Sequence, residues 1–283
     1  MLDQITPIIL TYNEAPNISR TLERLDWARE IVLVDSLSDD ETVAIAKSFS
    51  QVRLYQRPFD TFAAQWTFAL KETAIATDWV LGLDADFLLT TELIAELAAL
   101  QPPAATRAYK APLKYCVAGR PLRFSLLPPL IVLYQRGATT FFPDAHTYRV
   151  NVAGEVGMLN ASVLHDDRKS LRHWFHAQQG YAQLEAGKIL STATDALNSP
   201  DRIRRLRIVA PIAVFFYCLI RGGILDGYPG LYYAIQRALA ELMLSLYLLE
   251  NDLRIKSRRR DDVASGETSL GASICDESAD AAS

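Results

Sequence analysis

Asp84 and Asp86 are the residues whose type and spacing most clearly suit chemistry, because they follow the apolar run 79–83 directly. If that run is a buried strand, both carboxylates leave its carboxyl end and reach one divalent cation and, through it, a diphosphate. Hard oxygen ligands of this kind favour Mg²⁺ or Mn²⁺. Two aspartates so spaced also occur in solvated turns, so the pair alone is a weak signal. Its position after a buried run favours a metal site.

Two other polar segments also follow apolar runs. The first offers a ring that can pack on a base and polar groups for the base edge: Thr11, Tyr12, Asn13 and Glu14. The second begins with Asp35 and Ser36, and Asp35 is suited to accept hydrogen bonds from a ribose or a base. Serine and aspartate are also preferred residues at helix N-termini. Both roles are compatible, with Asp40 capping a helix and Asp35 binding.

The elements that position these segments alternate between strand and helix patterns over the first hundred residues. The predicted strands are 5–10, 30–35, 52–56 and 79–84, and the predicted helices are 15–27, 40–49, 62–76 and 92–100. Such alternation is typical of βαβ units on a parallel sheet. Ligands bind at the carboxyl ends of such strands. The three polar segments are therefore expected to meet in one cleft.

After Pro102 and Pro103 the pattern changes, and residues 107–165 are expected to be rich in β-strands and to recognise an acceptor. Residues 166–191 then form an amphipathic helical pattern. The apolar runs 208–220 and 231–249 follow; the first is shorter than a bilayer-spanning helix, and polar residues interrupt the second. We expect a helical hairpin at a membrane interface. The alternative is a helical subdomain or dimer interface.

Composition and charge bound the function classes. Half of the 283 residues are hydrophobic, which is enough for a sizeable core. The three cysteines show no paired spacing, so a disulfide framework or thiolate zinc site is not expected, and a reducing cytoplasm is the simplest setting. No signal-peptide pattern precedes the first strand.

Charge is distributed unevenly along the chain. Six acidic and no basic residues follow position 260, so residues 1–260 carry +2 although the whole chain carries −4. Arginines cluster at both flanks of the apolar runs, at 202–207 and 254–260, and favour either anionic lipid contact or solvated helix ends. No aromatic stacking platform accompanies them, so nucleic acid is not an expected partner. The acidic tail is predicted to be disordered.

The order of the motifs TYNE, VDSLSDDET and LDADF resembles the nucleotide-sugar domain of glycosyltransferase family 2. The segments FAAQWTFAL, DAHTYR, HDDRKSL and LDGYPGLYYAIQRALAE are similar to lipopolysaccharide core β-glucosyltransferases, over most of residues 5–250. The resemblance implies an α/β GT-A fold, a nucleotide diphosphate sugar donor, and a lipid-linked saccharide acceptor at the cytoplasmic leaflet. We therefore expect a peripheral protein on the inner face of the cell membrane.

Four regions are expected on this basis. Residues 1–106 form the nucleotide-sugar-binding half and 107–191 the acceptor-binding half of the GT-A domain, 192–254 the hairpin, and 255–283 a basic, then acidic, disordered tail.

The resemblance also implies roles for downstream residues. Asp144 corresponds to the catalytic acidic motif and is the expected base, although the family's Glu-Asp pair is Pro143-Asp144 here. Asp166 and Glu155 are the reserve candidates. The alternative for Asp144 is a turn cap with His146 as a structural partner.

Three further residues are assigned to the donor side of the site. His165 corresponds to the family's downstream histidine and would complete the metal sphere, and the alternative is a histidine satisfied at a strand end. With Asp84 and Ala85 beside Asp86, Arg168 and Lys169 would add positive charge around the diphosphate. Tyr148, where this family is expected to carry Gln, falls near the acceptor.

Two rival functions stay open. A polyprenyl-phosphate sugar transferase takes a phosphate acceptor and needs no general base. A non-catalytic, membrane-associated scaffold would keep the fold without turnover. A nucleotidyltransferase is disfavoured, because residues 11–19 (TYNEAPNIS) contain no glycine-rich loop to hold a triphosphate.

Overall fold

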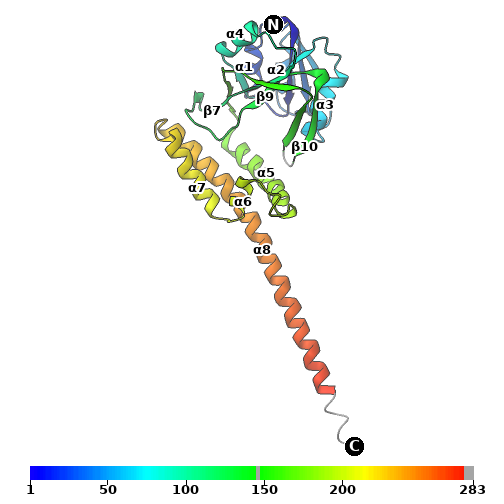
Figure 1. The fold of residues 1–283 in the computed structure, drawn as a ribbon, viewed down its shortest axis with the longest axis vertical. Coiled ribbons are helices and arrows are strands. Elements are labelled where there is room, and N and C mark those ends of the chain that lie inside the picture. Colours follow the sequence, from blue (N-terminus) through cyan, green and yellow to red (C-terminus); the bar gives the residue numbers. More distant parts are fainter. Residues whose placement is uncertain (145–146, 277–283) are drawn as a thin grey trace, which may run out of the picture. The chain divides into compact units, whose positions relative to one another are not determined.

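The computed structural model describes residues 1–144 and 147–276, and the chain divides into two compact units. The first unit comprises Met1–Ala177 and Val214–Arg237 and contains all the strands found in the described residues. The second comprises Gln178–Ala213 and Ala238–Ser283 and is helical where it is described. Figure 1 shows the elements with their labels.

A seven-stranded mixed sheet, in the order β12-β6-β9-β4-β1-β2-β3, forms the centre of the first unit. Its strands are β1 (Ile5–Thr11), β2 (Ile31–Asp35), β3 (Val52–Gln56), β4 (Trp79–Asp84), β6 (Thr106–Ala111), β9 (Leu130–Gln135) and β12 (Glu155–Met158). The strands β1 to β4 are parallel, as their alternation with helices predicts. Register places Thr11 opposite Asp35 and Leu10 opposite Asp84. The three polar segments therefore begin at one edge of the sheet.

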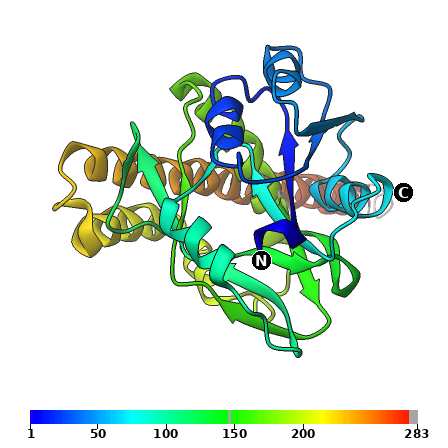
Figure 2. The same ribbon diagram turned by 90° about the horizontal axis from the view of Figure 1, so that it is seen from above.

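Helices cover both faces of this sheet (Figure 2). Residues from α1 (Ile18–Glu23), α2 (Thr42–Lys47) and α4 (Thr91–Ala99) pack with Ile9 and Leu33 on one face. The helix α3 (Phe62–Glu72) packs with Ile8 and Val32 on the other. β1 and β2 are near-continuous apolar runs, and because successive side chains point to opposite faces, both faces of the sheet are buried.

Helices α1, α2 and α3 are shorter than the sequence patterns predict, whereas α4 has the predicted length. α1 begins only at Ile18, because residues 14–17 form a turn in which the Glu14 carbonyl accepts from the amides of Asn17 and Ile18. Asp40 accepts from the Thr42 amide just before α2, as predicted for a capping residue, although the formal N-cap is Glu41.

The region 107–165 is rich in strands, as predicted. A second sheet has the order β5-β13-β7-β8, and a two-stranded hairpin joins β10 and β11. The bounds are β5 (Phe87–Leu89), β7 (Leu113–Val117), β8 (Arg120–Pro121), β10 (Thr139–Asp144), β11 (Thr147–Val152) and β13 (Val163–His165). The hairpin packs on α3 through Trp66 and Phe141, whose rings stack 5.7 Å apart. The pairing of β13 with β5 brings His165 opposite Phe87.

The remaining α-helices of the described chain are α5 (Leu171–Ser191), α6 (Ser199–Arg204), α7 (Val209–Cys218) and α8 (Tyr228–Asp276). A π-helical turn at Leu219–Gly223 follows α7. Within the second unit, Ala182 and Ile189 of α5 pack with Leu244 and Leu248 of α8. α8 continues through residues 255–276, where composition predicts a disordered tail. No helix in the described part of the chain has the length and apolar character needed to cross a membrane. The predicted domain boundaries stay predictions.

Candidate active site

Asp35 is a fully buried anchor at the end of β2. One carboxylate oxygen accepts from Thr11 Oγ1 at 2.9 Å and from Ser38 Oγ, and the other from the Ser38 amide at 2.9 Å and Gln56 Nε2 at 3.2 Å. Both oxygens are thus used within the protein. Ser36 is also held, since its Oγ accepts from Gln65 Nε2 at 3.0 Å. Direct binding of a ribose or base by Asp35 stays a prediction and would require exchange of one of these bonds.

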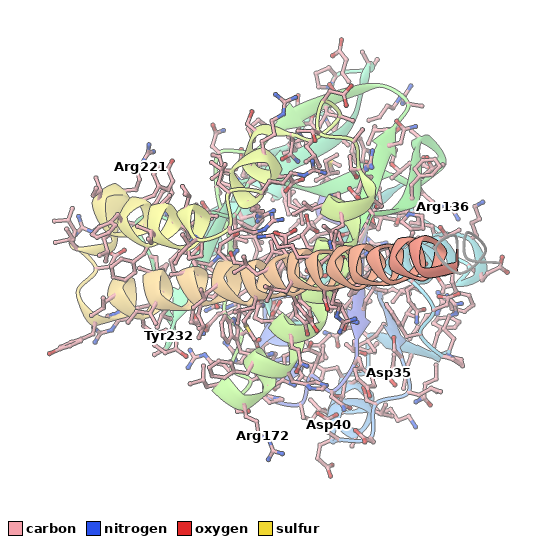
Figure 3. All side chains as sticks on the ribbon, turned by 90° about the horizontal axis from the view of Figure 1, so that it is seen from below. Asp35, Asp40, Arg136, Arg172, Arg221 and Tyr232 are labelled. Carbon is pink, nitrogen blue, oxygen red and sulfur yellow. The ribbon has the colours of Figure 1, made fainter. Side chains whose placement is uncertain are left out.

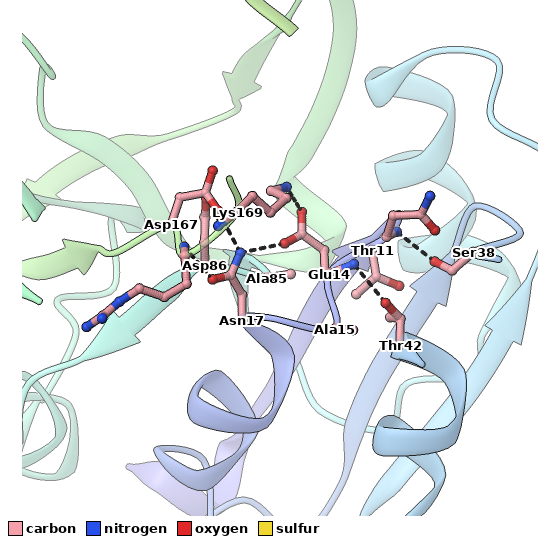
Figure 4. Close-up of polar contacts among 12 residues, drawn as sticks. Thr11, Glu14, Ala15, Asn17, Ser38, Thr42, Ala85, Asp86, Asp167 and Lys169 are labelled. Carbon is pink, nitrogen blue, oxygen red and sulfur yellow. Dashed lines mark hydrogen bonds and ion pairs between the residues drawn. The ribbon is translucent and has the colours of Figure 1, made fainter. Parts of the chain in front are cut away.

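The loop after β1 is tied to the loop after β2. Asn13, with φ of 53°, donates its amide to Ser38 Oγ at 2.9 Å and accepts from the Asp39 amide at 3.0 Å. The Glu14 amide donates to Thr42 Oγ1 at 2.7 Å (Figure 4). Tyr12 is 55% exposed and presents its ring to solvent, so it is available to stack on a base. Asp35 is labelled in Figure 3.

Asp86 and His165 meet at the edge of the second sheet. His165 Nε2 lies 3.0 Å from Asp86 Oδ2, whereas the buried Asp86 Oδ1 has no hydrogen-bond partner within the described residues. Burial lowers the pKa of His165, but the Asp86 carboxylate outweighs it and raises that pKa to about 9. Burial and the Asp86 charge together raise the pKa of Asp84 to about 6. The structure brings these three predicted residues together.

Ala85, between the two aspartates, is buried, and its carbonyl accepts from Thr21 Oγ1 at 2.6 Å. This bond attaches the Asp84–Asp86 turn to α1. A contact between Ala85 and the donor stays a prediction.

Arg168 and Lys169 lie where the sequence predicts positive charge, but both are paired within the protein. Asp166 accepts Arg168 at 2.9 to 3.1 Å and Arg20 Nη1 at 2.7 Å. Lys169 Nζ donates to Glu14 Oε1 at 2.5 Å (Figure 4). Two arginines share the Asp166 carboxylate, and Asp167 lies beside them through its bonds to Asn17 and to the Lys169 amide. Whether either side chain contacts a diphosphate stays a prediction.

Asn17 and Arg20 are site residues that sequence reasoning missed. The fully buried Asn17 donates to Glu14 Oε2 and Asp167 Oδ1, both at 2.8 Å, and accepts from the Arg168 amide at 2.8 Å. It thereby joins the first loop to the segment after β13. An asparagine three residues after TYNE was the available signal, but its partners Asp167 and Arg168 are about 150 positions away.

Asp144 ends β10 and accepts from Arg149 Nε of β11 at 2.9 Å. Tyr148 of the same hairpin lies close enough to Asp84 for that charge, after burial, to raise the Tyr148 pKa. The hairpin therefore approaches the edge that carries Asp84. His146, the alternative partner of Asp144, lies outside the described residues.

The two reserve candidates for the base fit less well. The Asp166 carboxylate is 4% exposed and occupied by two arginines. Glu155 pairs with Thr106 at the start of β6, which runs in the same direction as β4, so it lies at the opposite edge from Asp84.

The donor set suits a divalent cation. No group of three or more acidic, histidine or cysteine side chains in the described residues is placed to hold a metal ion, so the candidate ligands are the pair Asp86 and His165. A carboxylate oxygen that is buried without a partner is costly unless a donor or a cation completes it. Mg²⁺ sites commonly combine one or two protein carboxylates with substrate phosphates and water. The residues present therefore fit Mg²⁺ or Mn²⁺.

The sequence model of the family described as glycosyl transferase family 2 matches residues 6–102, which include both donor loops and the Asp84–Asp86 pair. About the first third of the chain is thus similar to glycosyltransferase family 2. A protein of Rickettsia felis named as an uncharacterized glycosyltransferase is 24% identical over 90% of this chain and 93% of its own length. A lipopolysaccharide core biosynthesis glycosyltransferase, LpsC of Rhizobium meliloti, is 32% identical over 34% of this chain and 37% of its own.

Among solved structures, residues 1–349 of S. aureus TarS with UDP-GlcNAc are 16% identical, with a TM-score of 0.49 over 89% of this chain and 92% of that one. The family resemblance and the α/β fold with its parallel strands β1 to β4, predicted from sequence, are confirmed.

Proposed function

We propose that this protein is an inverting family 2 glycosyltransferase that moves a sugar from a nucleotide diphosphate sugar to a lipid-linked saccharide such as lipopolysaccharide core. The observation that carries this proposal is the meeting of three segments, at Asn13, Ser38 and the Asp86–His165 pair, along one edge of the sheet. The partial likeness to LpsC supports the acceptor class.

In this proposal the chain's residues divide the work between nucleotide and diphosphate. The exposed Tyr12 ring stacks on the base, while the loop around Asn13 and Ser38 offers polar groups to the nucleoside. Asp86 and His165 hold Mg²⁺ or Mn²⁺, which supplies charge neutralisation for the departing diphosphate. Arg168 and Lys169 add positive charge beside it.

Asp144 removes the proton from the acceptor hydroxyl as the sugar is transferred with inversion. Its pairing with Arg149 orients the carboxylate. The base lies on the β10–β11 hairpin, whereas the metal-binding pair lies at the edge of the sheet. The attacking hydroxyl and the departing diphosphate are therefore served by different elements, as an in-line displacement requires.

The membrane part of the proposal rests on the α7–α8 hairpin. Its end in the first unit exposes Ile220, Ile224, Leu225 and Tyr228 by 68 to 89%. Figure 3 labels Arg221 in the same stretch, a cation suited to anionic head groups. We propose that this end lies in the cytoplasmic leaflet and keeps the enzyme at the lipid-linked acceptor.

The decisive experiment is donor binding. Purified protein is titrated with a panel of UDP-, GDP-, ADP- and CMP-linked sugars, with Mn²⁺ and with EDTA, for the wild type and for Asp86→Ala. We expect metal-dependent binding of one donor, lost in Asp86→Ala and kept in Asp26→Ala, an exposed aspartate of the loop before β2. Absence of binding across the panel would instead support the non-catalytic scaffold.

A further inference from the structure

Tyr115 of β7 lies between the imidazole of His165 and a ring from the C-terminal helix α8. Its ring centroid is 5.2 Å from that of His165, edge to face, and 4.9 Å from that of Tyr233. Phe87 contacts the same imidazole at 5.4 Å. The hydrogen bond to Asp86 fixes only one nitrogen of His165, so the two neighbouring rings set the rotation of the imidazole.

Tyr233 is itself held firmly. It is 3% exposed, and its hydroxyl accepts from the Leu126 amide at 2.8 Å. Leu122 and Cys218 are buried in the same apolar cluster. All of these residues belong to the first unit, although Tyr233 comes from the part of the chain beyond α7.

Two contacts keep this end of the hairpin in place. The Asp226 side chain accepts from the Arg123 amide at 2.9 Å, in the loop that also contains Leu126. Gly230 approaches Gly223 so closely that an added Cβ would lie 2.1 Å from the Gly223 carbonyl oxygen. A side chain at either glycine would move the turn of α8 that carries Tyr233.

We propose that Tyr115 and Tyr233 are positioning residues for His165, so that the C-terminal hairpin completes the metal-binding end of the donor site. This inference rests on the proposed function, in which His165 binds the cation. Tyr115 contacts the imidazole directly, and Tyr233 supports Tyr115. Loss of either tyrosine ring therefore leaves the imidazole freer to turn away from Asp86. Partners of metal-ligating histidines that fix ring orientation typically change metal affinity by about 10–100-fold when removed.

The test measures binding of Mn²⁺ alone to the full chain, by electron paramagnetic resonance of the free ion, well below each variant's melting temperature. The variants are Tyr115→Leu and Tyr233→Leu, which keep a large apolar side chain but remove the ring, and Tyr233→Phe, which keeps the ring. Tyr232→Leu is the matched control, because the adjacent Tyr232 is 41% exposed (Figure 3). Asp86→Ala marks complete loss of the site.

We expect the dissociation constant for Mn²⁺ to rise roughly 10-fold in Tyr115→Leu and Tyr233→Leu, and to stay at the wild-type value in Tyr233→Phe and Tyr232→Leu. A lower melting temperature with unchanged Mn²⁺ affinity in both Leu variants would mean that the two tyrosines are merely structural. That result would overturn this inference but leave the proposed function intact. If the wild type binds no Mn²⁺, the metal site of the proposed function fails as well, and the inference fails with it.

Discussion

Glu14 and Lys169 form an ion pair across 155 positions of the chain, with Lys169 Nζ 2.5 Å from Glu14 Oε1. The two side chains are 13 and 14% exposed. Burial raises the pKa of Glu14 to about 7 even though Lys169 opposes it, and the Asp86 charge adds to the rise. The loop after β1 is therefore joined to the segment after β13 by a carboxylate that titrates near neutral pH.

This pairing predicts a specific pH dependence of stability. Since the folded-state pKa of Glu14 lies above its ordinary value of 4.5, the folded state binds the proton more tightly. The free energy of unfolding should fall as pH rises from about 4.5 to about 7, then level off. Glu14→Gln should remove this fall, on the order of 1–3 kcal/mol. Urea unfolding at pH 5 and pH 8 measures this change for the wild type and for Glu14→Gln. The same change in the free energy of unfolding in both proteins would contradict a raised pKa of Glu14.

Gly119 predicts a different effect, on the Asp166–Arg168 pair. Its φ is +78°, and an added Cβ would lie 2.3 Å from Arg168 Nη2. Gly119→Ala should displace the guanidinium from Asp166 and lower the free energy of unfolding by about 1–3 kcal/mol. The control is Gly137→Ala, because a Cβ there meets no atom within 4 Å. Equal stability of the two variants, measured by urea unfolding, would show that the turn adapts without cost.

The sheet and the donor loops could be predicted from the sequence because their signals are local. Apolar runs such as β2 and β4 end at polar residues, and parallel strands align those ends. The roles within the loops could not be predicted this way. That Asp35 has both oxygens occupied depends on Gln56 and Thr11, which register alone brings beside it.

The sequence predicts that Arg168 and Lys169 lie at the site, but not which side chains they bind. The sequence predicts Arg168 beside a diphosphate, which stays a prediction, but it does not predict that the guanidinium binds Asp166 together with Arg20 of α1. These partners meet only because β13 adds to β5, a pairing that no local pattern encodes. The same holds for Tyr115 and Tyr233, whose contact depends on the packing of the hairpin.

Substitution of Asp144 should reduce turnover without weakening donor binding. Asp144→Asn keeps the size of the side chain and its bond to Arg149 but removes the base, so kcat should fall by roughly 100-fold or more. The dissociation constant of the donor should change little. Steady-state kinetics and donor titration measure the two, with Asp26→Asn as control. Equal losses would contradict the role, and undiminished transfer to a polyprenyl phosphate would favour the rival acceptor, which needs no base.

The exposed end of the hairpin predicts membrane binding through identified side chains. Ile224 and Leu225 are 68 and 70% exposed, which is costly unless an apolar phase covers them. The double substitution Ile224→Asp/Leu225→Asp should lower binding to vesicles containing anionic lipid by about tenfold or more, since each side chain loses ~1.5–3 kcal/mol of apolar burial. Vesicle flotation at low salt measures this loss.

The matched control for the membrane prediction is Val156→Asp/Met158→Asp on β12, where the apolar side chains are 41 and 56% exposed but belong to the central sheet. This variant should float with vesicles like the wild type. Because Ile224 and Leu225 contact neither the donor loops nor Asp86 in any described interaction, donor binding should survive their substitution. If both double variants float equally well, another surface binds the membrane, and the hairpin serves only the packing around Tyr233.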